Sequence, residues 1–306
     1  MTGVRSPTVR RRELGTLLRT LRAQAGLTVD QVAEQLLCSP SKISRLETGQ
    51  RGASARDIRD LSNIYGVQDS AQRDHLAALA REGKDQAWWQ PFDLPYATYV
   101  GLEAAAVSIS DYESGVFPGL LQIPAYARAL HDAALPRLSP EVIDQRIEVR
   151  LTRQEVLVRD NPPRLAAIMD EAVLHRVVGG PAVMRDQLEQ VIEVSALPHV
   201  TIRVIPFGAG AHPALDSTFS LLEFAHPVPS VVYVEGLVGQ MYLERPQDVE
   251  RYKSVFQHLL TIALSQEDSI HLMRRASGAY QSGLCRFREG SLAAQQLEAE
   301  EANASD

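Results

Sequence analysis

The sequence predicts two domains of different class: a mainly α N-terminal domain of five helices and an α+β C-terminal domain with a small mixed sheet. The chain has 306 residues, more than one average domain needs. Apolar residues recur at helical spacing as far as Leu79, whereas β-branched, alternating segments begin only near Arg164. We expect a first domain at 1–83, an aromatic linker at 84–98, a second domain at 99–276 and a frayed or disordered acidic tail at 277–306.

The composition is that of an ordinary globular protein, with 45% hydrophobic and 23% charged residues. No apolar run approaches the roughly 20 residues that cross a bilayer, and no apolar segment of an export signal follows the N-terminal arginines. The cysteines, Cys38 and Cys285, have neither zinc-site spacing nor the pattern of a disulfide framework. We therefore expect a cytoplasmic chain without membrane contact.

Charge is distributed unevenly between the two ends of the chain. The first 60 residues hold 11 basic and 6 acidic residues, a net charge of +5, whereas the rest holds 20 and 32, a net charge of −12. A basic head can neutralise phosphates and release counterions, and an acidic body limits non-specific adhesion. The distribution therefore favours a nucleic-acid-binding module at the N-terminus.

Spacing and capping residues predict the first two helices. Residues 11–25 place four leucines on one face, and Gly26 ends this helix. Thr28 and Gln31 have the spacing of a capping box at the start of a second helix that ends near Leu37. The leucines of the first helix are Leu14, Leu17, Leu18 and Leu21.

A third helix follows after a tight turn. Ser39 is placed to cap it, Pro40 suits its first position, and Gly49 closes it. Only Ile43 and Leu46 face inward. The outward residues are Ser41, Lys42, Ser44 and Arg45. Two short helices joined by a tight turn, with polar residues near the start of the second, are typical of a helix-turn-helix that enters the major groove.

The pattern S-x-x-x-I-S-x-L-E-x-G, together with Gly26-Leu27-Thr28 and Ala33, resembles the Cro/phage-repressor class of helix-turn-helix proteins, the XRE family, over residues 11–66. The resemblance implies that Ser41, Lys42 and Arg45 lie against bases or phosphates, with Arg45 suited to a guanine. It also implies a buried structural ion pair between Arg22 and Glu47. The expected DNA-binding residues are Thr28, Ser39, Ser41, Lys42, Ser44, Arg45 and Arg51.

One residue departs from that class. Leu37 stands at the turn position that usually holds glycine or another residue tolerating a left-handed backbone, a conformation costing roughly 1–2 kcal/mol for a side chain with a Cβ. We expect the turn to be adjusted locally. Helices at 54–65, capped by Ser54, and at 70–82 complete the five-helix domain.

The second domain mixes helices with late strands. Its predicted helices lie at 102–114, from Pro124 onward, at 139–159 with a basic face, and last at about 246–265. Its predicted strands lie at 164–169, 200–206, 217–224 and 230–235. Because these strands do not alternate with helices at regular spacing, we expect a small mixed sheet and not a Rossmann sheet.

Five short motifs in this half resemble the antitoxin-like regulators of filamentous, antibiotic-producing bacteria, which carry a C-terminal domain of unknown function. The resemblance implies a regulator often encoded beside a small protein that binds or antagonises it, and it implies no enzyme activity. No partner-contact residue is carried over. The motifs are Pro118-Gly-Leu-Leu-Gln122, Tyr126-Ala-Arg128, Arg150-x-x-Arg153-Gln154, Asp170-Glu171-x-x-Leu174 and Val232-Tyr-Val-Glu235.

Residues that could carry catalysis form no recognisable constellation. The histidines are scattered, and the glycines at 208–210 lack a phosphate-binding fingerprint. Four carboxylates could meet and serve acid–base chemistry, but solvated positions or pairing with Arg146, Arg150 and Arg153 are the favoured alternatives. These carboxylates are Asp170, Glu171, Asp216 and Glu235. We therefore expect no enzyme, no catalytic residues, no metal and no cofactor.

Together these patterns predict a sequence-specific transcriptional regulator, a repressor, that binds a double-stranded DNA operator as a homodimer, because one recognition helix covers only a half-site. The C-terminal domain would bind an effector or a protein partner. The main alternative is an antitoxin-like protein that neutralises a small neighbouring protein and autoregulates its operon. A hydrolase targeted by a DNA-binding head is a third, weaker alternative.

Overall fold

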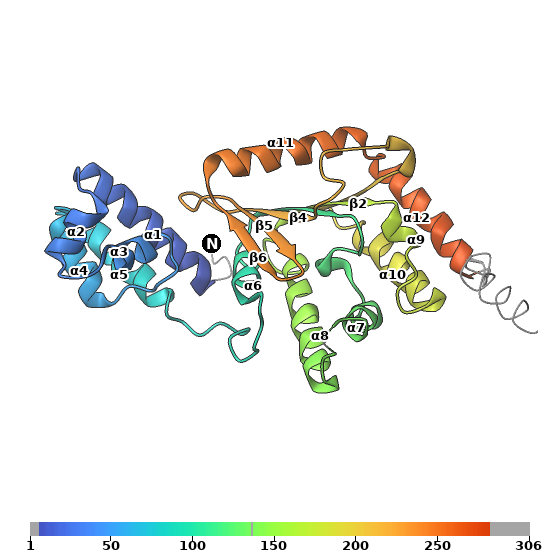
Figure 1. The fold of residues 1–306 in the computed structure, drawn as a ribbon, viewed down its shortest axis with the longest axis horizontal. Helices are drawn as coiled ribbons and strands as arrows, with labels where there is room; N and C mark the ends of the chain where they lie inside the picture. Colours follow the sequence, from blue (N-terminus) through green and yellow to red (C-terminus); the bar gives the residue numbers. More distant parts are fainter. Residues whose placement is uncertain (1–5, 136, 282–306) are drawn as a thin grey trace, which may run out of the picture.

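A computed structural model describes residues 6–135 and 137–281, and it confirms the predicted fold class (Figure 1). Five helices form the N-terminal part, and a six-stranded mixed sheet with helices on both faces forms the C-terminal part. The N-terminal helices are α1 (Pro7–Gln24), α2 (Val29–Gln35), α3 (Pro40–Glu47), α4 (Ala55–Ile64) and α5 (Ser70–Glu82).

The sheet has the strand order β3-β2-β1-β4-β5-β6. The three strands β1, β2 and β3 are parallel, and the remaining neighbours are antiparallel. It is thus a mixed sheet, one half of which is built from strands joined by helical crossovers. The strands are β1 (Ser108–Glu113), β2 (Arg164–Asp170), β3 (Val200–Ile205), β4 (Phe219–Glu223), β5 (Val231–Gly236) and β6 (Gly239–Leu243).

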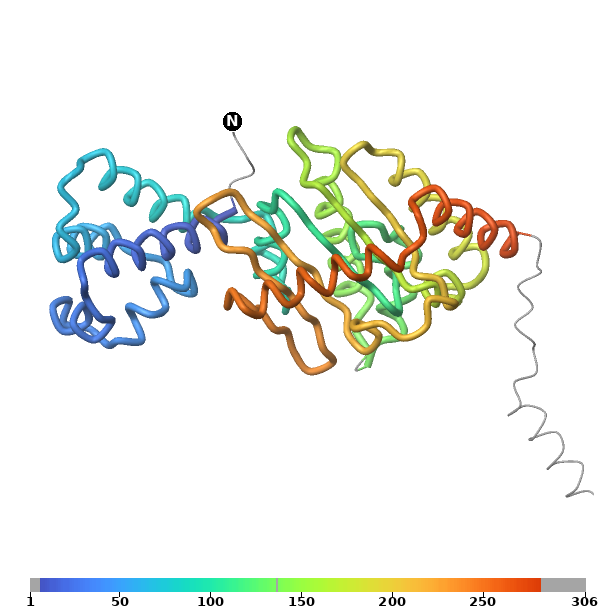
Figure 2. The backbone as a smooth tube through the Cα atoms, turned by 90° about the horizontal axis from the view of Figure 1, so that it is seen from above, coloured from blue at the N-terminus to red at the C-terminus, as the bar shows by residue number. Residues whose placement is uncertain are grey.

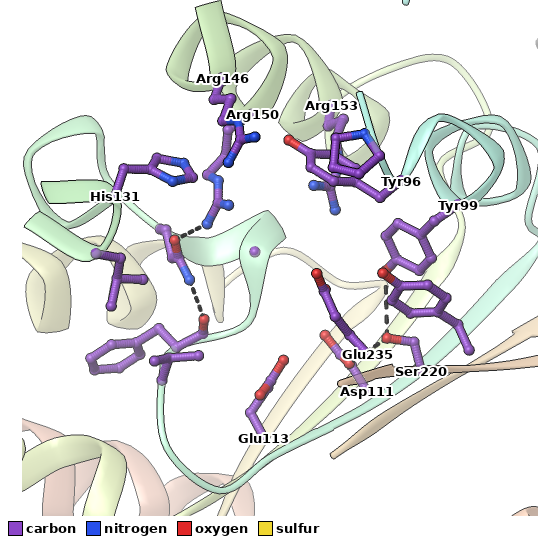
Figure 3. A pocket seen from close by; sticks show the side chains of 17 residues that line it. Tyr96, Tyr99, Asp111, Glu113, His131, Arg146, Arg150, Arg153, Ser220 and Glu235 are labelled. Atoms are coloured by element: carbon purple, nitrogen blue, oxygen red, sulfur yellow. Dashed lines mark hydrogen bonds between the residues drawn. The ribbon is translucent and has the colours of Figure 1, made fainter. Parts of the chain in front are cut away.

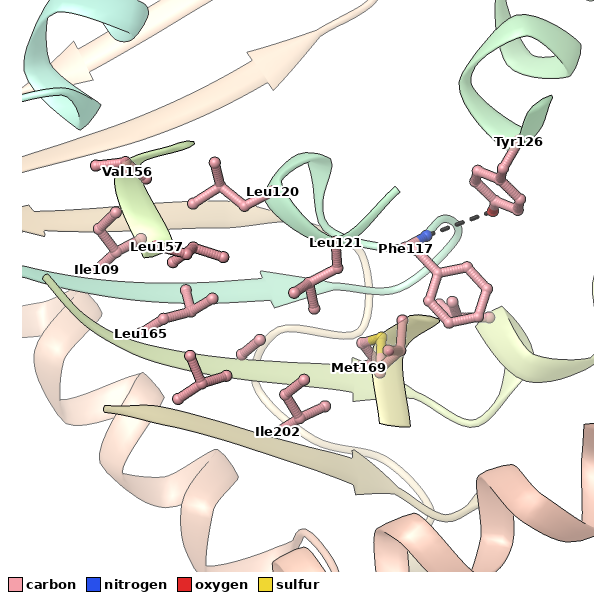
Figure 4. Packing of buried hydrophobic residues seen from close by; sticks show 14 of the residues in the cluster. Ile109, Phe117, Leu120, Leu121, Tyr126, Val156, Leu157, Leu165, Met169 and Ile202 are labelled. Carbon is pink, nitrogen blue, oxygen red and sulfur yellow. Dashed lines mark hydrogen bonds between the residues drawn. The ribbon is translucent and has the colours of Figure 1, made fainter. Parts of the chain in front are cut away.

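Helices cover both faces of this sheet (Figure 1). The helix α11 packs on one face with Ile168, while Leu165 and Met169 point to the other face, where Figure 4 shows them against Leu121 and Leu157. Strands buried on both sides need apolar residues at successive positions, as β2 has. The helices of this part are α6 (Ala97–Glu103), α7 (Pro124–Asp132), α8 (Pro140–Gln154), α9 (Ala172–His175), α10 (Pro181–Val194), α11 (Pro246–Ile262) and α12 (Gln266–Gln281), with short 3-10 turns at Gly119–Leu121, Glu155–Leu157 and Phe207–Ala209.

The predicted helix at 102–114 is wrong. The helix α6 ends at Glu103, and the chain then enters β1, the central strand between β2 and β4. Leu102, Ala106 and Ile109 are all buried, so they mimic one face of a helix, although they come from two elements. Because the apolar spacing of this segment predicts a helix, it conceals β1 and with it the parallel half of the sheet.

The end of the described chain also differs from the expectation. The helix predicted as the last one, at 246–265, ends at Ile262 and is followed by α12, which packs along α10 and contributes Met273 and Tyr280 to the core. Residues 277–281 of the predicted tail belong to α12, and the remainder of the predicted tail lies outside the described residues. The strand β6 and the helix α10 were not predicted.

The helix α1 belongs to both halves of the molecule, as the tube in Figure 2 shows. Its first turn contributes Val9 to the core of the C-terminal part, and Leu14 and Leu18 lie in the N-terminal core. The hydroxyl of Ser6 donates to the carbonyl of Gly101 on α6. One continuous helix therefore connects the two cores.

The aromatic segment before α6 packs against the second half. Trp89 and Leu94 are buried together with Val100 of α6 and Val149 of α8. Trp88 lies edge-on to Trp89, with ring centroids 5.5 Å apart. These residues thus contribute to packing between α6 and α8.

Candidate nucleic-acid interface

Local hydrogen bonds fix the turn between α2 and α3. The hydroxyl of Thr28 accepts a bond from the amide of Gln31 at 3.2 Å, and the Gln31 side chain accepts one from the Thr28 amide at 2.9 Å. The hydroxyl of Ser39 accepts a bond from the amide of Lys42 at 3.3 Å. Both helix starts are therefore capped by their own side chains, which fixes the direction in which α3 leaves the turn.

Leu37 adopts the left-handed conformation, with φ of 51°. The expected local adjustment is therefore not seen: the turn keeps its usual geometry despite the side chain. Leu37 is 93% exposed, and the amide of Cys38 after it bonds to the carbonyl of Ala33 at 2.9 Å. The turn thus carries roughly 1–2 kcal/mol of backbone strain, which the packing of α2 against α3 must offset.

The inner face of α3 packs tightly on the domain core. Ile43 and Leu46 are buried beside Ala33 of α2. A Cβ atom on Gly15 of α1 would lie 2.5 Å from the carbonyl oxygen of Glu47, so the glycine lets α1 touch the end of α3. This contact fixes the orientation of α3 relative to α1.

Six of the seven expected DNA-binding residues are exposed: Thr28, Ser39, Ser41, Ser44, Arg45 and Arg51. Thr28 and Ser39 use their hydroxyl oxygens as acceptors in the caps and keep their O–H donors. The side chains of Ser41, Ser44, Arg45 and Arg51 form no hydrogen bond or ion pair within the described part of the chain. These donors are therefore available to a ligand outside the domain.

Lys42 differs from the other six. Its ammonium lies 2.6 Å from the carboxylate of Asp57 in the first turn of α4. Burial alone would raise the pKa of Asp57, but hydrogen bonds from Lys42 and Ser54 outweigh it and lower the pKa. Lys42 thus connects α3 to α4, a scaffold role that the sequence did not indicate.

Arg22 and Glu47 form the second link between helices. Two bonds join them, Nε to Oε1 at 2.6 Å and Nη2 to Oε2 at 3.0 Å, and Arg22 also donates to the carbonyl of Leu27 at 2.8 Å. The side chains are 15% and 6% exposed. The hydrogen bond to Glu47 raises the pKa of Arg22 although burial opposes it. This bidentate pair ties α1 to the end of α3.

The four carboxylates considered for acid–base chemistry have separate surroundings. Asp170 lies 3.9 Å from the ring of His212, and Glu171 accepts a bond from the amide of Phe207 at 2.7 Å. Asp216 lines a surface hollow near Arg251, whereas Glu235 lines a different cavity. Over residues 6–135 and 137–281, no group of three or more His, Cys, Asp or Glu side chains is placed to hold a metal ion.

The fold and the exposed face of α3 define the class: a helix-turn-helix protein with a second, α+β domain. Residues 13–76 match the helix-turn-helix domain family, which indicates DNA binding and transcriptional regulation. Residues 96–275 match the family described as a domain of unknown function, DUF5753, and the chain belongs to that family. No curated protein and no solved structure matches the chain. In the part that the structure describes, no helix combines the length and apolar character needed to cross a membrane.

Proposed function

We propose that the protein is a sequence-specific repressor that binds a double-stranded DNA operator as a homodimer. The observation that carries the proposal is the contrast on α3. Lys42 is paired with Asp57 and Glu47 with Arg22. By contrast, Ser41, Ser44 and Arg45 are exposed and unpaired in the described structure. A rigid helix that presents free donors is suited to reading base edges in the major groove.

The surrounding residues fit contacts to phosphates. Thr28 and Ser39 stand at the starts of α2 and α3, where hydroxyl and amide donors position a helix-turn-helix on the backbone of DNA. Arg51 follows α3 and is exposed. We assign base reading to Ser41, Ser44 and Arg45, and phosphate contact to these three flanking residues.

The experiment is retention of DNA from the region upstream of the protein's own gene by the full chain at two salt concentrations. We expect retention that weakens with salt and is lost in Arg45→Ala. The matched control is Arg81→Ala, which removes the same charge from an exposed position on α5. Equal retention by both variants would overturn the assignment of α3 as the reading helix.

The hairpin of β5 and β6 favours a protein–protein contact. Leu237 and Val238 at its tip are fully exposed, and Met241 on the edge strand β6 is half-exposed. Such apolar tips on an edge strand are typical of interfaces. In the proposed homodimer a second copy covers this surface; in the antitoxin-like alternative a small partner protein does. If the hairpin forms the dimer interface, the double variant Leu237→Asp with Val238→Asp should sediment as a monomer. A variant that still sediments as a dimer would exclude the hairpin from the dimer interface and favour a contact with a small partner protein.

A further inference from the structure

A charged, partly open cavity of about 270 Å³ lies between the sheet and the helices α6, α7 and α8 (Figure 3). Three arginines line its upper wall in that view, and three carboxylates line the opposite side. The arginines are Arg146, Arg150 and Arg153, and the carboxylates are Asp111, Glu113 and Glu235. Nothing in the DNA-binding function accounts for this arrangement.

The cationic wall is a single face of α8, because its arginines are spaced by four and three residues. Arg153 is neutralised by two bonds to Glu103, at 2.7 and 2.8 Å. Arg150 donates to the neutral side chain of Gln122. Within the described residues, neither Arg146 nor Arg150 has a carboxylate within ion-pair distance. Two half-buried positive charges therefore face the cavity without a directly paired carboxylate, although Glu235 lies close enough to influence the pKa of Arg150.

The opposite wall of the cavity carries carboxylates that lack a directly paired basic side chain. Asp111 and Glu113 point from β1 and Glu235 from β5, and none of the three forms an ion pair with any residue of the described ranges. Asp111 accepts a hydrogen bond from the hydroxyl of Ser220 at 2.7 Å. Burial raises the pKa of Asp111 to about 6, and burial with the charges of Asp111 and Glu235 raises that of Glu113. Both shifts arise chiefly from burial, and the positive charges of Arg153 and Arg150 offset them only in part.

Unsatisfied polar atoms gather at the same place. The Nε atoms of Arg146 and Arg150, the Nε2 atom of His131 and the hydroxyl of Tyr96 are buried without a hydrogen-bond partner in the described structure. All four side chains line the cavity. Because buried polar groups are nearly always paired, their concentration in one cavity marks a place for a polar ligand. Burial and the charges of Arg150 and Arg146 lower the pKa of His131 to about 4, so its ring is neutral near pH 7.

We propose that this cavity binds a small amphoteric molecule of the amino-acid or dipeptide class, with its carboxylate at Arg146 and Arg150 and its ammonium at Asp111, Glu113 and Glu235. A simple anion would face the three carboxylates, and a simple cation would face the two arginines. Only a ligand with both charges can pair with the arginines on one side and with the carboxylates on the other. The volume lies at the small end of ligand sites, which suits a molecule of this size.

The cavity is connected to the DNA-binding half. Arg153 joins α8 to Glu103 on α6, and α6 carries Gly101, which contacts Ser6 and Thr8 of α1 and its cap. The helix α1 then enters the N-terminal core with Leu14 and Leu18. A ligand that moves α8 against α6 can therefore shift α1, which would alter DNA affinity. This effect on DNA rests on the proposed function, whereas binding in the cavity does not.

The test is thermal denaturation of the full chain with each of the twenty common amino acids and with dipeptides of glycine as probes. We expect at least one probe to raise Tm by about 5 °C at roughly 100-fold excess over its Kd. Its N-acetylated form, without the ammonium, and its amide, without the carboxylate, should each lose the shift. No shift with any probe would overturn the proposal, as would equal shifts with acetate or with methylamine.

Two variants locate the site. Arg150→Gln and Glu113→Gln should each reduce the affinity for the probe at least tenfold, measured by calorimetry. Arg185→Gln, on the far helix α10, removes an arginine outside the cavity and should bind as the unmodified chain does. Undiminished binding by both cavity variants would place the ligand elsewhere and overturn the proposal. DNA retention without the probe is measured in parallel, so that loss of operator binding and loss of ligand binding are distinguished.

Discussion

Arg153 of α8 and Glu103 of α6 form a bidentate, buried ion pair two residues from Gly101, the residue on which the start of α1 rests. Tyr99 stacks over the guanidinium of Arg153, whose carbon lies 5.2 Å from the ring centroid. This pair therefore lies at the junction of three features: the charged cavity, the helix α6 and the helix that carries the DNA-binding core.

Glu47→Ala should destabilise the protein by about 3 kcal/mol, at the lower end of the range for a broken buried pair because Arg22 keeps some contact with solvent. The loss would appear as a lower free energy of unfolding in urea. Glu34→Ala, at an exposed position on α2, serves as the control and should change little. A Glu47→Ala variant that melts like the unmodified chain would contradict the structural role of the pair.

Lys42→Ala should act chiefly on stability. In a double-mutant cycle with Asp57→Ala, we expect a coupling energy of about 0.5–1 kcal/mol, because both side chains are partly shielded and share one hydrogen bond. The salt dependence of DNA binding should stay the same. If Lys42→Ala instead lowers the salt slope by about one without a change in stability, Lys42 contacts a phosphate.

Arg45→Ala should lower the affinity for the operator by about 1–3 kcal/mol and relax the base preference at one position. Its side chain is exposed and forms no bond within the described domain, so the free energy of unfolding should be unchanged. Binding to a set of operators with single base changes gives the measurement. A uniform loss across all sequences would assign Arg45 to a phosphate.

Asp111→Asn should stabilise the ligand-free protein at neutral pH. Burial, helped by the charge of Glu103 and opposed by the Ser220 bond and by Arg153, raises the pKa of Asp111 from 3.8 to about 6, so the folded state binds its proton more tightly than the unfolded state. The stability contributed by that proton is full below pH 4 and is lost as the pH rises through 6. Asparagine cannot ionise and can still accept the bond from Ser220.

The gain in Asp111→Asn should therefore be about 1–3 kcal/mol at pH 8 and should vanish toward pH 4. Urea unfolding at both pH values measures it. A variant that is less stable than the unmodified chain at pH 8 would show that the carboxylate is compensated in the folded state.

Gly101→Ala should weaken the connection between α6 and α1. A Cβ atom at this position would lie 2.3 Å from the hydroxyl oxygen of Thr8, so the first turn of α1 must move, at a cost of about 1–3 kcal/mol. Faster cleavage near Ser6 in limited proteolysis would report the movement. Gly115→Ala, where nothing lies within 4 Å of the new atom, should behave as the unmodified chain.

Features that depend on neighbours in the sequence could be predicted. The capping box of Thr28, the cap at Ser39 and the buried pair Ile43 and Leu46 follow from spacings of three residues, and the structure has all of them. The strands β2, β3, β4 and β5 were likewise evident from apolar and β-branched runs. The strand β1 was not, because its polar residues Ser108, Ser110 and Asp111 conceal a buried central strand.

The sequence by itself determined the class of both halves, the order of the N-terminal helices and the polar outer face of α3, since periodicity and capping are local properties. Only the tertiary structure decided that Lys42 is bound to Asp57, that α1 joins two cores, and that arginines of α8 face carboxylates of β1 and β5. Such relationships join residues that are not neighbours in the sequence. Burial and Coulomb interaction depend on distance in space, which a pattern read along the chain does not contain.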